Sequence, residues 1–191
     1  GQAGSGKSHL VKSTVRSLEE GGWAESVSLT YQDPRGAEDG YFGAARAILR
    51  PWKETENTLV PRLRRRLARE RGVLDAAIKE EANLLARWCG VLPDDEEQPL
   101  PPGFGLREVY RHLDARAWRG LSVMVLEDVH HALDDGDGLW LAESAAASPD
   151  ARPVLVIATL RAEALESNPA LRERVTALCE AGAIRLDLET L

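Results

Sequence analysis

Apolar positions along this chain follow two patterns, helical spacing and short uninterrupted runs. From Lys7 onward, apolar residues recur at every third or fourth position until Gly21 and Gly22, which predicts a helix over this stretch. The segment "ESVSLTY" (25–31) is rich in strand-forming residues and precedes the turn-like "DPRG", which predicts a strand. The chain therefore opens as a loop, a helix and a strand.

The middle of the chain, from about residue 39 to residue 120, is patterned as helices. Within it, "LPDDEEQPLPPG" (92–103) holds four prolines and four acidic residues, which indicates an irregular, solvated linker. In the arginine-rich stretch 62–71, Leu63 and Leu67 lie one turn apart among charged positions. This spacing is typical of an amphipathic helix with a charged outer face rather than of a nucleic-acid site. We interpret 39–120 as a helical insertion.

Three apolar runs in the second half of the chain predict buried strands, namely 121–128 ("LSVMVLED"), 152–161 ("RPVLVIATLR") and 183–188 ("AIRLDL"). Helical patterns lie between them, near 139–147 and 169–181. Strands that alternate with helices predict an α/β fold whose mostly parallel sheet is covered on both faces. A chain of 191 residues is long enough for one such domain.

Charge and cysteine content narrow the class of protein. A formal net charge of −7 argues against binding of nucleic acid or of an anionic membrane across the protein surface, so we expect neither as a direct partner. The only two cysteines, Cys89 and Cys179, have no spacing typical of a disulfide framework or a zinc site, which fits a reducing, cytoplasmic setting. No apolar run approaches the roughly 18 residues that a membrane-spanning helix needs.

The first eight residues, "GQAGSGKS", fit the phosphate-binding pattern G-x-x-x-x-G-K-S. Its glycines let backbone N–H groups turn toward phosphate oxygens, and the following helix presents its positive end. Lys7 would reach the β- and γ-phosphates of ATP, and Ser8 would hold Mg²⁺. Such a loop directly follows a strand, and we expect that strand upstream in a longer parent chain. The alternative is an ordinary glycine-rich turn. The predicted nucleotide contacts are Gly1, Gly4, Ser5, Gly6, Lys7, Ser8 and the backbone of His9.

Hydrolysis requires a carboxylate at the end of another buried strand. Glu127 and Asp128 supply it, and we expect Glu127 and Ser8 near the magnesium, with Asp128 either orienting the attacking water or also binding the metal. Thr159 and Arg161 end the next run, where one of them could sense the γ-phosphate. These four residues are the catalytic candidates. The alternative is that the two acids merely end a strand and that Arg161 starts a helix in solvent.

The segments "GQAGSGKSHL", "VMVLEDVHHA" and "VLVIATLR", followed by "IRLDL", resemble the nucleotide-binding domain of STAND-class signalling ATPases, a branch of the AAA+-like P-loop fold. The resemblance covers nearly the whole chain and is strongest to large bacterial LuxR-type regulators and to kinase- or cyclase-linked ATPase modules. It implies a three-layer α/β sandwich with strand order 5-1-4-3-2. The loop-bearing first strand is missing here, and 26–31, 121–127, 153–159 and 184–188 would be the second to fifth strands. Loss of that central strand is expected to destabilise the isolated chain.

Those regulators often read "LEDLHWAD" where this chain reads "LEDVHHAL", so that His131 replaces the aromatic residue and Leu133 the final acid. The resemblance implies an ATP-binding, slowly hydrolysing switch domain of a multidomain bacterial signalling or transcriptional regulator. Its expected partners are nucleotide, other domains of the parent chain, and further copies in nucleotide-dependent self-association. The two replacements favour an alternative, a non-catalytic interaction module. A small-molecule P-loop kinase fits less well, because the helical insertion and "LEDVHHA" resemble signalling ATPases more closely.

Overall fold

The computed structural model separates the chain into two compact units, one from Gly1–Gly40 with Tyr110–Leu191 and one from Tyr41–Val109. The residues that it describes are 6–34, 36, 39–72, 76–93, 95, 96, 99–101, 103–116, 120–132 and 154–188. No helix among them is both long and apolar enough to cross a lipid bilayer.

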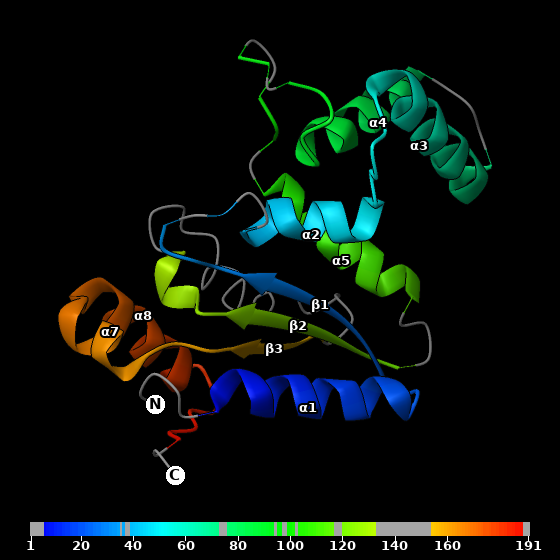
Figure 1. Cartoon of the computed structure of the whole chain (residues 1–191). Helices are drawn as coiled ribbons and strands as arrows, with labels where there is room; N and C mark the ends of the chain where they lie inside the picture. Colours follow the sequence, from blue (N-terminus) through cyan, green and yellow to red (C-terminus); the bar gives the residue numbers. More distant parts are fainter. Residues whose placement is uncertain are drawn as a thin grey trace. The chain divides into compact units, whose positions relative to one another are not determined.

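The first unit contains a three-stranded parallel sheet, in the order β1 (Ala24–Thr30), β2 (Leu121–Glu127) and β3 (Val154–Ala158) (Figure 1). Thr30 lies opposite Glu127 and Leu126 lies opposite Ala158, so the three strands end at one edge of the sheet. The central strand β2 pairs on both sides and is buried along nearly its whole length. The chain is therefore an α/β protein, and the predicted strands over 26–31, 121–127 and 153–159 are confirmed to within two residues.

One face of this sheet is covered by α1 (Lys7–Glu20). The helix contributes Val11, Val15 and Leu18, which recur at helical spacing and pack against the alternate β2 residues Val123 and Val125. In Figure 1 the amino end of α1 lies at the end of the sheet toward which the three strands point. The helix thus brings its first turn to the edge where β2 and β3 end.

Three short elements follow the strands in this unit, η1 (Val129–His131) after β2, and α7 (Ala162–Ser167) and α8 (Pro169–Glu180) after β3. Asn168 caps α8, since its side chain accepts a hydrogen bond of 3.0 Å from the N–H of Leu171. The predicted helix over 169–181 is confirmed. The helix predicted near 139–147 lies outside the described residues.

The strand predicted over 184–188 is wrong. This segment forms no strand, and its Ile184 and Leu186 side chains are 86% and 77% exposed. Within the described part of the chain, β3 pairs with β2 alone and no strand lies beside 184–188. A lone extended segment has no partner for its backbone N–H and C=O groups, so an apolar run by itself does not make a strand. The fifth strand of the expected sheet order is therefore not formed here.

In the sequence, helices lie between β1 and β2. They are α2 (Gly40–Leu49), α3 (Glu56–Arg71), α4 (Ala76–Trp88) and α5 (Phe104–Arg116). In the second unit, α3 packs against α4 and buries Leu59, Leu63 and Leu67 on one face, while its arginines lie around that stripe. This confirms the amphipathic helix predicted from the arginine-rich stretch.

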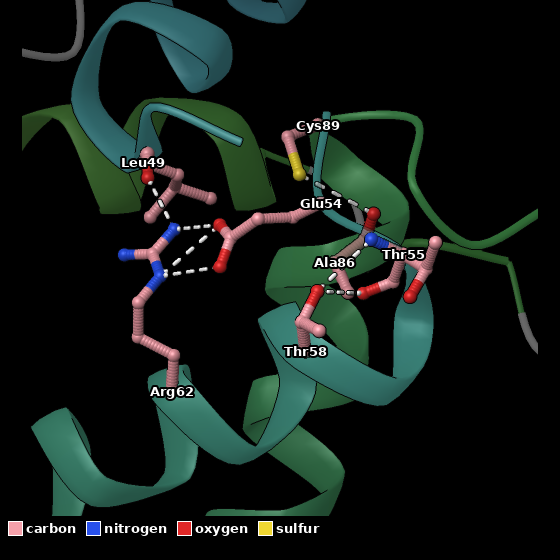
Figure 2. Close-up of polar contacts among 7 residues, drawn as sticks. All are labelled: Leu49, Glu54, Thr55, Thr58, Arg62, Ala86 and Cys89. Carbon is pink, nitrogen blue, oxygen red and sulfur yellow. Dashed lines mark hydrogen bonds and ion pairs between the residues drawn. The ribbon is translucent and has the colours of Figure 1, made fainter. Parts of the chain in front are cut away.

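A polar network fastens the start of α3 inside the second unit (Figure 2). The Arg62 guanidinium meets both carboxylate oxygens of Glu54, the shortest contact being 2.6 Å, and also donates to the carbonyl of Leu49 at 2.8 Å. The N–H of Thr55 donates to the hydroxyl of Thr58 at 3.0 Å, which satisfies a backbone donor just before the helix. Burial raises the pKa of the nearby Cys89 thiol, so this cysteine stays protonated at neutral pH.

Candidate functional site

The described part of the predicted phosphate loop begins at Gly6, and Gly1, Gly4 and Ser5 lie outside it. Gly6 is the N-cap residue of α1 and has a left-handed backbone, with φ of 76°. Such a conformation costs an L-residue about 1–2 kcal/mol, which explains why the pattern places glycine directly before the lysine. Gly6 also has no side chain that could cap the N–H groups of the first helical turn.

Lys7, Ser8 and His9 form that first turn. Lys7 and Ser8 are half-buried, whereas His9 is exposed. No acidic residue lies in the first turn, so the positive end of the helix dipole is not offset there by a carboxylate of α1. The amino end of α1 thus combines a cationic side chain, a hydroxyl and N–H groups, which is the chemistry that binds a phosphate.

Glu127 closes β2 and lies on the face of the sheet that α1 covers, because alternate strand residues share a face with Val125. Its side chain is only 7% exposed, and its Oε2 lies 3.2 Å from Nζ of Lys12 on α1. Lys12 follows Ser8 by four residues, so the two occupy the same side of the helix with Cβ atoms about 6 Å apart. The predicted carboxylate and the predicted hydroxyl therefore belong to one side of α1, one helical turn from each other.

Asp128 and Thr159 join the ends of β2 and β3. Asp128 has a left-handed backbone, with φ of 54°, and its N–H donates to the Thr159 hydroxyl at 3.0 Å. The Thr159 N–H donates to the carbonyl of Leu126 at 2.8 Å, and its carbonyl accepts from the N–H of Val129 at 2.9 Å. Thr159 is 6% exposed. It therefore holds the backbone of Asp128 in place, and its hydroxyl proton stays available for donation to another group.

His130 lies directly beside this turn, with 6% of its side chain exposed. Neither ring nitrogen has a hydrogen-bond partner within the described residues, and Nδ1 lies 4.0 Å from Oδ1 of Asp128. Its ring packs on that of His131, with centroids 3.9 Å apart. Burial lowers the pKa of His130, with smaller contributions in the same direction from His131 and from the charges of Arg161 and Lys7, whereas the Asp128 charge raises it.

Magnesium was expected between Ser8 and Glu127, and the donors there suit it. No group of three or more histidine, cysteine, aspartate or glutamate side chains within the described residues could hold a metal by itself. Mg²⁺, however, often binds through one or two carboxylates together with phosphate oxygens and waters. The nearly buried Glu127 carboxylate already has a cation, Lys12 Nζ, beside it. The Ser8 hydroxyl and the Glu127 carboxylate fit a metal that is shared with a bound phosphate, whereas the Lys12 ammonium competes with it for the carboxylate.

The structure joins Asp128 and Thr159 by a hydrogen bond at the end of the sheet, directly after Glu127. Ser8 lies one helical turn before Lys12, which contacts Glu127, and Arg161 follows Thr159 by two residues. Sequence reasoning assigned no role to Lys12 or His130. Lys12 could have been identified from its position one helical turn after Ser8, combined with the strand alternation that places Glu127 on the face covered by α1. No comparable signal in the sequence marks His130 as a buried imidazole without partners.

No protein-family model matches this chain, and the comparisons with curated proteins and with solved structures gave no match either. The function is therefore argued from the residues at the edge of the sheet.

Proposed function

We propose that this chain is the ATP-binding, Mg²⁺-dependent switch domain of a multidomain bacterial signalling or transcriptional regulator, of the STAND class of P-loop ATPases, and that it hydrolyses ATP slowly. One observation carries the proposal. The amino end of α1, with Lys7 and Ser8, lies on the same side of the sheet as Glu127, to which α1 is linked through Lys12 at 3.2 Å. The parallel order β1-β2-β3 agrees with the second, third and fourth strands of the expected sheet.

Each residue has a role in this proposal. Lys7 and the N–H groups at the start of α1 bind the phosphates of ATP. Magnesium, when bound at Ser8 and Glu127, would offset the negative charge that develops on the β- and γ-phosphates. Asp128 orients the attacking water, and Thr159 fixes the backbone of Asp128 through the 3.0 Å hydrogen bond. Arg161 responds to the γ-phosphate.

ATP and ADP differ by the γ-phosphate, so a domain that contacts this group can favour different conformations in the two states. Arg161 is the N-cap residue of α7, and a movement of its side chain toward phosphate would bear on the start of this helix. In this proposal, the change is passed to other domains of the parent chain and governs nucleotide-dependent self-association. The partner is nucleotide, without nucleic acid or membrane.

The test is the affinity of the intact protein for ATP in the presence of Mg²⁺, measured by calorimetry. Lys7→Ala should weaken binding by about tenfold or more, because a charge-assisted contact to phosphate is lost. Lys79→Ala removes the same charge from an exposed position on α4 in the second unit and should leave the affinity unchanged. Equal ATP affinity in the Lys7→Ala variant and the unmodified protein would reject the proposal.

The alternative, a non-catalytic interaction module, is favoured by one observation. His131 stands where related signalling ATPases carry an aromatic residue, and its ring is occupied by packing on His130. Measured ATP turnover separates the two functions. An ATPase should lose turnover in Asp128→Asn, whereas an interaction module should show no turnover with or without this change and should retain its partner binding.

A further inference from the structure

Lys12 and Glu127 form an ion pair whose two members differ greatly in exposure. The Lys12 side chain is 67% exposed, whereas that of Glu127 is 7% exposed, and 3.2 Å separates Nζ from Oε2. Within the described residues, this is the ion pair found for Glu127. A nearly buried carboxylate that loses its cationic partner is strongly disfavoured, so the pair stabilises the site before any ligand arrives.

The pair lies where the proposed metal would bind. Ser8 and Lys12 are one turn apart on α1, and Glu127 points toward that side of the helix from the end of β2. A divalent cation held by the Ser8 hydroxyl and the Glu127 carboxylate would therefore meet a carboxylate that an ammonium group already neutralises. Two cations at one carboxylate repel each other, so binding of the second favours departure of the first.

Lys12 is able to leave at low cost. With two thirds of its side chain exposed, its ammonium can move to water while the aliphatic stem stays on the helix surface. Glu127 has no such freedom, because it is enclosed between the strand end and α1. The movable member of the pair is thus the lysine.

We propose that Lys12 is a positioning residue that holds the Glu127 carboxylate in the nucleotide-free protein and is displaced from it by the divalent cation that accompanies ATP. The inference rests on the proposed function, since it concerns the metal of that same site. It gives the protein a built-in counter-ion that keeps the carboxylate oriented while the site is empty and that opposes occupation by the metal. Lys12 therefore reduces the gain in ATP affinity that Mg²⁺ provides.

The experiment measures the affinity of the intact protein for ATP by calorimetry, once in EDTA and once with saturating Mg²⁺. The ratio of the two dissociation constants reports the effect of the metal on binding and does not depend on turnover. Lys12→Met should raise this ratio about fivefold, because the competing cation is removed. Lys12→Arg keeps the charge and should leave the ratio close to that of the unmodified protein.

Two further variants control for indirect effects. Arg16→Met removes a positive charge one turn further along α1, where Arg16 pairs with Glu20 and not with Glu127, and should not change the ratio. Glu127→Gln should bring the ratio toward one, and adding Lys12→Met to it should then have no effect. Circular dichroism checks folding, and Lys12→Gln, which keeps a neutral donor for Glu127, replaces Lys12→Met if the latter does not fold.

The outcomes separate this inference from the function on which it rests. A raised ratio in Lys12→Met, with Lys12→Arg and Arg16→Met unchanged, supports it. An unchanged or lowered ratio in Lys12→Met, with ATP still bound, overturns the displacement of Lys12 and leaves the ATP-binding function intact. Failure of the unmodified protein to bind ATP under both conditions overturns the proposed function and this inference together.

Discussion

Thr159→Val is the most direct test of how the two strand ends are joined. Valine keeps the shape of threonine but removes the hydroxyl that accepts the Asp128 N–H at 3.0 Å. An unsatisfied buried donor costs about 1–3 kcal/mol. Because this hydrogen bond is only partly buried, water can partly replace the lost acceptor, so we expect a loss near the lower end, about 1 kcal/mol. Thr159→Ser keeps the hydroxyl and loses one methyl group, which also costs about 1 kcal/mol.

Stability alone does not separate the two variants, so the decisive assay is amide hydrogen exchange at Asp128. Thr159→Val should accelerate exchange of this amide about fivefold, whereas Thr159→Ser should leave it nearly as slow as in the unmodified protein. Chemical denaturation of the same samples gives the change in unfolding free energy. If Asp128 exchanges equally slowly in Thr159→Val and Thr159→Ser, the hydroxyl is not what holds this turn.

Three other outcomes are expected. In EDTA without nucleotide, the free energy of unfolding should be retained above about pH 6.5 and fall at lower pH, because the lowered pKa of His130 makes the unfolded state bind more protons there. Urea titrations at several pH values should show that His130→Asn weakens this loss, and an unchanged loss in the variant would contradict the role of His130. Leu63→Ala should cost about 2–5 kcal/mol in the same assay, since its side chain is fully buried, and a loss below 1 kcal/mol would contradict the packing of α3. Glu54→Gln, which weakens the pair with Arg62, should lower the free energy of unfolding by about 1 kcal/mol. Glu70→Gln, in the exposed i,i+4 pair with Arg66, should lower it by less than about 0.5 kcal/mol, and equal losses in the two variants would contradict a special role for the Arg62 network.

Much of the sheet could be predicted because a buried parallel strand can be recognised from the apolar residues of one short segment. Residues 123–126 form an uninterrupted apolar run, and the observed β2 has the predicted bounds, 121–127. The segment 183–188 alternates apolar and charged residues, a pattern that also suits a strand, but it forms none. Whether a segment becomes a strand also depends on a neighbour that offers hydrogen-bonding groups, and this information lies elsewhere in the chain.

The candidate site was predictable in outline and not in its contacts. The glycine, lysine and serine spacing located the start of α1, and the two acids located the end of β2. The Lys12 to Glu127 pair depends on which side of α1 docks on the sheet, which follows only when the apolar stripe of the helix and the alternation of the strand are combined. The His130 environment depends on the left-handed turn at Asp128, a conformation that sequence seldom specifies for a residue other than glycine.

One side of β3 has no partner strand within the described residues, and this has a practical consequence for handling the protein. A row of backbone donors and acceptors beside apolar side chains such as Leu155, which is 43% exposed, is a template on which another polypeptide can add a strand. Ile184 and Leu186 are further exposed apolar side chains in this unit. Concentrated solutions of this chain should therefore be prone to aggregation by strand addition, and charged gatekeeper substitutions on this side, rather than changes at the nucleotide site, are the first remedy to try.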